Sequence, residues 1–322
     1  MLAYLLRRLA YAVVLLLAVV SLNFLLIHIS PGDPVETIAG SMGGLSDELR
    51  EQLRAQYGLD KPFLVQLGVY LLHVLQGNLG YSYYFNLPVS DLIWQRVPAT
   101  LLLVVTSVFF AFLIGTLLGT LSARRPNGPL SQVITVVAAI GYSAPVFWTG
   151  IVLIILFASI FPVFPVSDMR SAGSDGLGLA GVLDVLHHLV LPAFTLAFVQ
   201  LAQYSRLSRA SVMDALSSDY IRTARAKGLS EGRVLYKHAL RNGILPVMTM
   251  LGMQFGNVLA GAILVETVFN WPGLGRLAFD SVLRRDYPTL LGILLFSSML
   301  VVIMNQLTDL AYRLVDPRIK TS

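Results

Sequence analysis

The chain has 322 residues, of which 56% are hydrophobic and only 13% charged, and its mean hydropathy is +0.72. This composition is far more apolar than that of a soluble domain and indicates an integral membrane protein. The net charge of +5 does not indicate nucleic-acid binding, because the basic residues gather at the ends of apolar segments. Cysteine is absent, which excludes disulfides, thiolate metal sites and cysteine nucleophiles.

The first apolar run, Leu9 to Ile27, follows Arg7 and Arg8 and has roughly the 20 residues that one membrane crossing requires. A signal peptide, a twin-arginine signal and a permanent anchor can all begin in this way. The residues at its end (27–31, IHISP) lack the small-x-small cleavage pattern, so we favour the anchor. We expect 1–29 to form the cytoplasmic N-terminus and first transmembrane helix.

No run of spanning length lies between Pro31 and Val97, so we expect 30–97 to be an extracytoplasmic helical region. Ser46 can open a helix that stops at Gly58. Pro62 can open a second helix that stops at Gly77.

Five further apolar segments are long enough to cross a bilayer. The third apolar run of the chain is longer than one crossing needs and contains Ala144-Pro145, so we expect one tilted helix with a kink there. The five segments are 98–121, 130–160, 189–204, 244–265 and 288–312.

The distribution of Lys and Arg predicts the topology. With the N-terminus inside, 15 of the 23 basic residues fall on the cytoplasmic side, although the outer segments are together longer. Both termini are then cytoplasmic. We expect 98–316 to form the core domain of five transmembrane helices with a cytoplasmic loop at 206–243, and 317–322 to form a cytoplasmic tail.

The loop contains a basic, polar insert from Ser217 to Pro246 that carries helix signals. Ser217 to Asp219 can cap a first helix, and Gly228 suits the left-handed position that ends one. Ser230 can cap a second helix, which Asn242-Gly243 is expected to close. The insert is therefore predicted to form a compact knob of two short helices, although an ordinary basic loop that only fixes topology is the simpler possibility.

The order Arg222-Thr223-Ala224, then Gly228, then His238-Ala239-Leu240-Arg241 resembles the EAA loop of importer-type ABC transporter permeases, in the form of the dipeptide, oligopeptide and nickel branch. The general motif has an acidic residue where Arg222 stands, so contacts known for sugar or vitamin importers do not transfer directly. A second phrase, ETVFNWPGLGRL at 266–277, is similar to the pattern of the same branch. Shorter phrases from Ser30 to Ile319 extend the resemblance over most of the chain.

The resemblance implies an all-α integral membrane protein with six transmembrane helices, the importer-type ABC permease fold, in a bacterial or archaeal plasma membrane. Such a chain forms half of the pathway for dipeptides or oligopeptides and is not itself an enzyme. Its expected partners are a homologous second permease, two ATP-binding subunits and an extracytoplasmic solute-binding protein. This chain has no G-x-x-x-x-G-K-[ST] motif, so ATP and Mg are expected in the partner subunits and no cofactor in this chain.

Two other functions stay open at this stage. The same machinery could carry nickel, a metal chelate, glutathione or an opine. An integral membrane enzyme is a remote alternative, because we find no convergent nucleophile, base or metal set. His187 and His188 are adjacent and therefore form a poor metal pair, so no metal site is expected.

The candidate site residues form three groups. For ATPase coupling they are Asp219, Tyr220, Arg222, Thr223, Ala224, Arg225, Ala226, Lys227, Gly228 and Leu229. For binding-protein docking or an outer gate, with aromatic anchors at the surface, they are Glu266, Phe269, Asn270, Trp271, Pro272 and Gly273. For the solute path, where neutral polar groups lie within spans, they are Ser143, Gln254 and Asn257. Gly252 and Gly256 with Ala260 are expected to pack closely against the partner permease.

Overall fold

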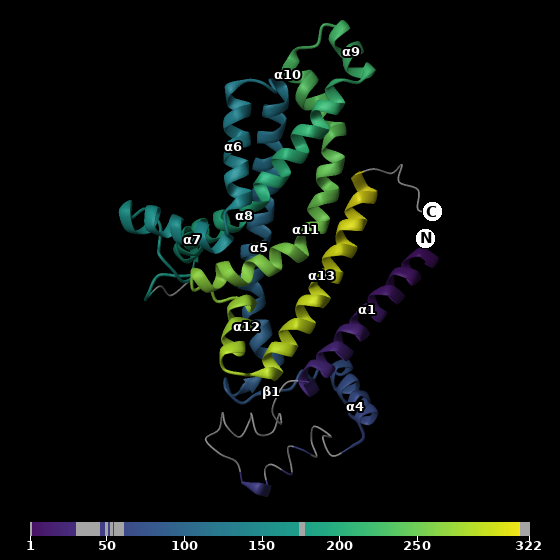
Figure 1. Ribbon diagram of the computed structural model, residues 1–322, viewed down its shortest axis with the longest axis vertical. Helices are drawn as coiled ribbons and strands as arrows, with labels where there is room; N and C mark the ends of the chain where they lie inside the picture. The colour runs from purple at the N-terminus through teal and green to yellow at the C-terminus, as the bar shows by residue number, and fades with distance from the viewer. Residues whose placement is uncertain are drawn as a thin grey trace. The chain divides into compact units, whose positions relative to one another are not determined.

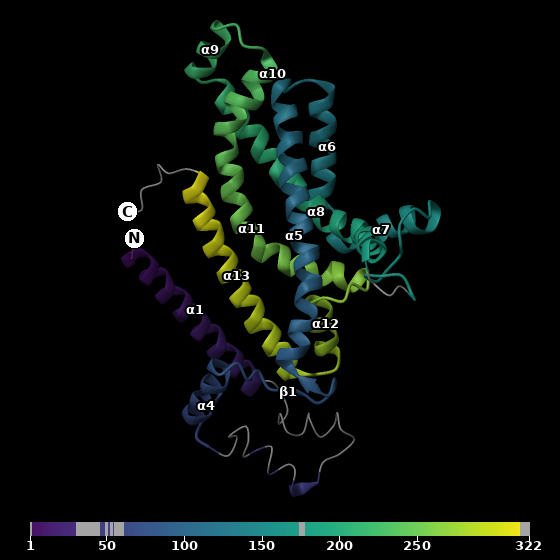
Figure 2. The same cartoon turned by 180° about the vertical axis from the view of Figure 1, so that it is seen from behind.

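The computed structural model describes residues 2–29, 46–48, 51, 54, 61–173 and 178–315 (Figures 1 and 2). Most of the helix expected from Ser46 to Gly58, and the tail 317–322, lie outside these residues. The elements in chain order are α1 (Leu2–Ile29), α4 (Phe63–Leu75), β1 (Tyr81–Ser82), β2 (Leu87–Pro88), α5 (Val89–Arg124), α6 (Pro129–Ser143), α7 (Val146–Ile154), the π-helical turn η1 (Ile155–Ile160), α8 (Gly178–Leu216), α9 (Asp219–Ala226), α10 (Glu231–Arg233), the π-helical turn η2 (Val234–Ala239), α11 (Leu240–Val268), α12 (Leu274–Leu283) and α13 (Tyr287–Val315).

The chain divides into two compact units. The first consists of Met1–Pro98 and Leu277–Ile303, and the second of Ala99–Arg276 and Met304–Ser322. The second unit contains the knob and the turn at 266–276, and is described in more detail below.

In the first unit, a polar cluster holds the start of α13. Asp286 precedes this helix, and its Oδ2 atom accepts hydrogen bonds from the Ser82 hydroxyl at 2.5 Å and the Thr289 hydroxyl at 2.7 Å. A carboxylate at this place satisfies donors that a helix N-terminus leaves free and suits its positive end. Ser82 lies on β1, which pairs with β2 in an antiparallel hairpin. The hairpin is thereby fastened to α13.

Helix α5 begins at Val89, nine residues before the start we expected at Pro98. Proline inside a helix removes a hydrogen bond and costs roughly 3 kcal/mol. Here Val89, Leu92, Ile93 and Val97 lie on one helical face and are all buried. Burying such side chains contributes about 1.5–3 kcal/mol each, which outweighs the cost of the proline.

In the second unit, α5 crosses α8 with almost no side-chain volume between the two backbones. A Cβ atom on Gly119 would lie 2.4 Å from the Ser205 carbonyl oxygen, and one on Gly115 would lie 2.7 Å from the Tyr204 Cβ atom. The Ser208 hydroxyl donates to the Thr116 carbonyl across the same crossing at 3.0 Å. Gly115 and Gly119 therefore form a G-x-x-x-G contact within the chain, of the type used in membrane helix packing.

The run expected to be one kinked helix, 130–160, is broken instead. Helix α6 ends at Ser143 and α7 begins at Val146, and the two pieces are bent by 109° (Figures 1 and 2). Ala144 and Pro145 have extended backbones, with ψ angles of 133° and 136°. The residue before a proline avoids the α region, and two consecutive extended residues reorient the chain much more than a kink does.

The second helix of the insert also differs from expectation, because Asn242-Gly243 does not end it. Residues 231–268 run from α10 through η2 directly into α11. A Cβ atom on Gly243 would lie 3.0 Å from a methyl group of Val212. Gly243 thus allows α11 to approach α8, and its absent side chain serves packing rather than helix termination. Helix α12 and the hairpin were not expected from the sequence.

Three helices in the described part of the chain are long and apolar enough to cross a membrane: Val89–Arg124, Gly178–Leu216 and Tyr287–Gln306. The bent pair α6 and α7 with η1 makes a fourth crossing if it counts as one span. Shorter apolar stretches, Ala10–Leu25 and Val258–Val268, lie in α1 and α11. The described part of the chain is therefore mostly helical, and several of its helices are long and apolar enough to cross a membrane.

The close approach of the α5 and α8 backbones leads to a first prediction. Gly119→Ala should lower the thermal unfolding temperature of the purified chain in detergent by several degrees, because the new methyl group must separate two backbones. Gly68→Ala is the matched control, since a Cβ atom there meets nothing within 4 Å. An unchanged or higher unfolding temperature for Gly119→Ala would show that the crossing is not as tight as described.

Candidate functional site

The knob, which we define as residues 219–239, has a small apolar core of its own. Ile221 of α9 is fully buried, and Ala224, one turn later, is 6% exposed. They pack with Val234 and Leu235 of η2 and with Val212 of α8. The core therefore joins the knob to α8, and η2 joins it without interruption to α11 (Figure 1).

The outer face of α9 carries most of the expected coupling residues. Ala224 is the exception, because it is buried in the knob and can act only as scaffold; Leu229 is half-buried against the same core. The exposed members are Asp219, Tyr220, Arg222, Thr223, Arg225, Ala226, Lys227 and Gly228. The structure thus places one aromatic ring and three basic side chains on a surface that a protein partner could contact.

Gly228 ends α9 in the left-handed region, with a φ angle of +73°. Its N–H donates to the Arg225 carbonyl at 2.9 Å, and the Leu229 N–H reaches back to the Ala224 carbonyl at 3.3 Å. This is the helix ending that the sequence predicted. A Cβ atom at Gly228 meets nothing within 4 Å, so a side chain would be opposed by backbone strain alone.

An ion pair spans the turn between α9 and α10. The Arg225 guanidinium donates to both carboxylate oxygens of Glu231, at 3.0 and 3.3 Å. Both side chains are about half exposed, so the pair is worth little in stability on its own. The Ser218 and Ser230 hydroxyls, by contrast, make no side-chain cap, although both residues occupy the N-cap positions that we expected.

The second candidate region is the aromatic turn, residues 266–276, between α11 and the first turn of α12. Glu266 is completely buried there. Its carboxylate accepts a hydrogen bond from the Thr100 hydroxyl at 2.7 Å and another from the Arg276 N–H at 3.0 Å. The Thr100 hydroxyl in turn accepts the Leu274 N–H at 2.8 Å. Glu266 and Thr100 together satisfy N–H groups that the start of α12 would otherwise leave free.

One close contact of a glycine and one hydrogen bond of a tryptophan complete this turn. A Cβ atom on Gly273 would lie 2.3 Å from the Glu266 carboxylate, so only glycine fits beside the acid. The Trp271 ring is fully buried, and its Nε1–H donates to the Ala99 carbonyl at 2.9 Å. The expected surface anchors Trp271 and Phe269 are therefore in the core, because both rings pack in the apolar cluster that includes Leu103.

Asn270 is the half-buried apex of the turn and has a positive φ angle of 55°. Its side-chain amide donates to the Asp168 carboxylate, and the Phe269 carbonyl accepts the Asp168 N–H at 2.8 Å. The Arg276 guanidinium donates to the Asn270 carbonyl at 3.0 Å. The turn is thus fastened on one side to α12 and on the other to the segment that follows η1.

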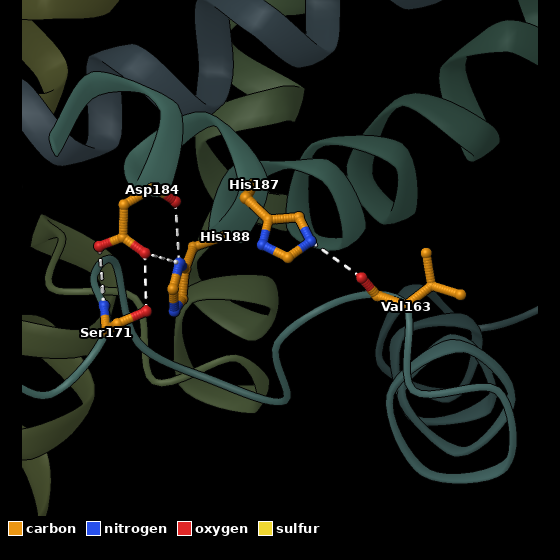
Figure 3. Close-up of polar contacts among 5 residues, drawn as sticks. All are labelled: Val163, Ser171, Asp184, His187 and His188. Carbon is orange, nitrogen blue, oxygen red and sulfur yellow. Dashed lines mark hydrogen bonds and ion pairs between the residues drawn. The ribbon is translucent and has the colours of Figure 1, made fainter. Parts of the chain in front are cut away.

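The same segment is fastened to α8 by a second polar cluster (Figure 3). Asp184 accepts the Ser171 N–H at 2.9 Å and its hydroxyl at 2.7 Å, and the His188 Nδ1 atom lies 2.9 Å from the Asp184 carbonyl. The His187 Nε2 atom lies 2.8 Å from the Val163 carbonyl (Figure 3). Each histidine thus contacts a different partner. In the described part of the chain no group of three metal-ligating side chains gathers.

Two of the three candidate path residues are described at the level of their side chains, and their surroundings differ. Ser143 is exposed at the end of α6, whereas Gln254 is buried on α11 and donates to the Gln203 amide oxygen at 2.5 Å. The side chain of Asn257 lies outside the part that the structure describes. Gln200 of α8, another neutral polar residue of the spans, has a buried Oε1 atom without a hydrogen-bond partner among the described residues.

Burial of the aromatic turn predicts how its tryptophan responds to truncation. Trp271→Ala should destabilise the chain by about 3–5 kcal/mol, because it leaves a large cavity and an unpaired carbonyl. The measurement is the fraction of chain that stays monodisperse after heating in detergent. Trp148→Ala, at a ring that is 51% exposed, is the control and should change little. Equal loss in both variants, or none in Trp271→Ala, would contradict the role of Trp271 as a core residue.

Two family models match the chain. "Binding-protein-dependent transport system inner membrane component" matches residues 115–321, and the corresponding N-terminal model matches residues 1–104. Together they include the knob, the aromatic turn and the first helices.

Relatives and solved structures agree with these matches. The oligopeptide transport system permease protein AppB of Bacillus subtilis (strain 168) is 40% identical over 321 residues, covering 99% of this chain and 100% of its own length. The dipeptide transport system permease protein DppB of Escherichia coli (strain K12) is also 40% identical, over 341 residues and 99% of each chain.

A chain of the MetNI methionine ABC transporter, solved in inward-facing conformations, aligns with a TM-score of 0.57 at 17% identity, over 70% of this chain and 96% of that one. That likeness shows a shared fold. The matches to the family models and the two relatives cover the chain from end to end, and the chain therefore belongs to the family of binding-protein-dependent transport system inner membrane components.

Proposed function

We propose that this chain is the permease subunit of an ATP-driven importer and forms half of a membrane pathway for dipeptides or oligopeptides. The cargo follows from relatives that are 40% identical over the full chain and are named for oligopeptide and dipeptide transport. The geometry that carries the proposal is the knob, whose buried core and unbroken chain connect an exposed basic helix to two long apolar helices.

In this proposal the chain has six transmembrane helices in a plasma membrane, with both termini and the knob in the cytoplasm. The clustering of Lys and Arg around the knob supports this orientation. Residues 30–97 would then lie outside the cytoplasm. The other parts of the importer would be a second permease, two ATP-binding subunits and a solute-binding protein, and ATP with Mg would be bound by the ATP-binding subunits.

Coupling in this proposal passes through α9. Tyr220, Arg222 and Lys227 would contact a groove on an ATP-binding subunit, since they are exposed and no part of the knob core needs them. A force on α9 would reach α8 through Ile221 and α11 through η2. The knob would therefore move the two helices as a lever when the ATP-binding subunits close.

The aromatic turn would act as an outer gate rather than as a set of contact anchors. Glu266, Thr100 and Trp271 hold its shape from within. What it offers to a solute-binding protein is the backbone and side chain of Asn270, together with Pro272 at its edge. The solute path would use neutral groups such as Gln254 and Gln200.

The coupling proposal predicts the effect of a side chain at the end of α9. Gly228→Val should reduce solute-stimulated ATP hydrolysis of the reconstituted importer by roughly fivefold or more, because a left-handed β-branched residue costs at least about 1 kcal/mol. Gly232→Val is the matched control, since Gly232 also has open space around it but not a positive φ angle. If Gly228→Val keeps full stimulation and transport, the knob is not the coupling element.

The energy source can be tested separately. No Asp, Glu, Lys or Arg lies in the middle of the six predicted spans, so we expect no proton- or ion-coupled centre within the membrane. Peptide uptake into proteoliposomes should require ATP on the cytoplasmic side, stop when the Walker lysines of the ATP-binding subunits are replaced, and continue with a protonophore. Uptake that needs a proton gradient and continues without ATP would overturn the proposed function.

A further inference from the structure

An open cavity of about 390 Å³ lies between α5, α6 and α8, near the end of α8 that leads into the knob. It is polar along one side and carries two arginines one helical turn apart on α8. Its lining residues are Ser122, Ile134, Thr135, Ala138, Ser205, Arg206, Arg209, Ala210, Met213 and Asp214.

The cavity lining includes one acidic residue, Asp214, but the contacts of both arginines are to neutral groups. The Arg209 guanidinium donates to the Thr135 hydroxyl at 2.9 Å and to the Pro126 carbonyl at 3.0 Å. The Arg206 guanidinium lies over the Tyr142 ring, 4.7 Å from its centre. Neither arginine forms an ion pair with another residue of the described ranges. The contacts orient both groups while leaving their positive charge without a paired anion.

An apolar surface begins beside these charges. Leu130, Val133, Val137 and Ile140 follow one another at helical spacing on α6, and each is between 42% and 58% exposed. The adjacent face of α6, with Ile134 and Ala138, is buried and lines the cavity. The exposed face is thus a strip along which hydrocarbon chains can lie, and it leads directly to the cationic cavity.

We propose that this cavity binds the phosphodiester headgroup of an anionic phospholipid, whose acyl chains extend along α6. Guanidinium groups bind phosphate oxygens through paired, charge-assisted hydrogen bonds. Basic pockets between membrane helices on the cytoplasmic side suit such headgroups. Arg206 follows the apolar segment 189–204 of α8 by two residues, and in the proposed orientation a headgroup at the end of that segment would be within its reach.

The bound lipid would make the position of the knob depend on the lipid composition of the membrane. Arg209 joins α8 to the α5–α6 connection through Pro126, and Asp214 lies only five residues before α9 begins. A headgroup held by both arginines would therefore brace the end of α8 against α6. Its loss would loosen the helix that carries the knob.

The test is native mass spectrometry of the full chain purified in detergent, with added palmitoyl-oleoyl phosphatidylglycerol or palmitoyl-oleoyl phosphatidylcholine. We expect phosphatidylglycerol to bind at least tenfold tighter. Arg206→Gln should weaken its binding by roughly fivefold. Ala210→Phe should weaken it by filling the cavity without changing charge. Arg233→Gln, at an exposed arginine of α10 outside the cavity, should leave it unchanged.

Arg206→Lys keeps the charge and should bind with intermediate affinity, which preserves the test if Arg206→Gln does not fold. Equal binding of the two lipids, or unchanged binding in both Arg206→Gln and Ala210→Phe, would overturn the proposal. Arginine-dependent displacement of the lipid by millimolar inorganic phosphate would also overturn it, in favour of a small-anion site. So would loss of the lipid when the second permease is co-purified, because the cavity would then be a protein interface.

Discussion

The close crossing of α5 and α8 is the constraint on which the second unit depends most. With no side chain on Gly119 or Gly115, the two backbones approach until hydroxyl groups from one helix reach carbonyls of the other. In lipid, helix association has little hydrophobic drive, so such close contact and interhelical hydrogen bonds supply much of the attraction. Helix α8 can therefore be 39 residues long and still hold a fixed place. The cavity arginines and the knob both lie on or after its far end.

A second constraint is the burial of Glu266. An isolated buried carboxylate is costly, but this one faces the start of α12, where free N–H groups and the helix dipole favour a negative charge. Asp286 at the start of α13 follows the same principle in the other unit, with Ser82 and Thr289 as donors. In both places a single acid decides where a helix begins after a turn. Both acids therefore serve structure.

The sequence correctly predicted helix ends where they depend only on residues that are neighbours in the chain. Gly228 could be recognised because a left-handed helix end strongly favours glycine, and Pro62 with Gly77 correctly bounded α4. Gly243 carries the same local signal as Gly228, but it allows α11 to pack on Val212 instead of ending a helix. No sequence window shows whether a glycine serves a turn or a contact, since the contacting residue is about 30 positions away.

Long-range contacts also determine the burial of the aromatic turn and the residue at which α5 begins. Trp271 is surrounded by polar and turn-forming residues, which suggested exposure, yet its ring nitrogen finds the Ala99 carbonyl some 170 positions earlier. Pro98 looked like a helix start, yet buried residues before it keep the helix intact. The G-x-x-x-G spacing occurs at both 115–119 and 252–256, and the structure gives the first pair a close contact within the chain. Packing of the second pair against a partner permease stays a prediction. Only the partner backbone distinguishes a contact stripe from a chance spacing.

The division of the knob into core and surface bears on how it can transmit force. The core residues Ile221 and Val234 are completely buried, so a push on α9 moves close-packed groups that cannot be compressed appreciably. The Arg225–Glu231 pair is half exposed and screened, so it can limit the orientation of the turn but cannot carry a comparable load. If α9 is pushed as the proposed coupling requires, the displacement would divide between α8, through Val212, and α11, through the unbroken backbone of η2. Two helices that cross at Gly243 would therefore tilt together, and a permease of this design needs no separate hinge at the knob.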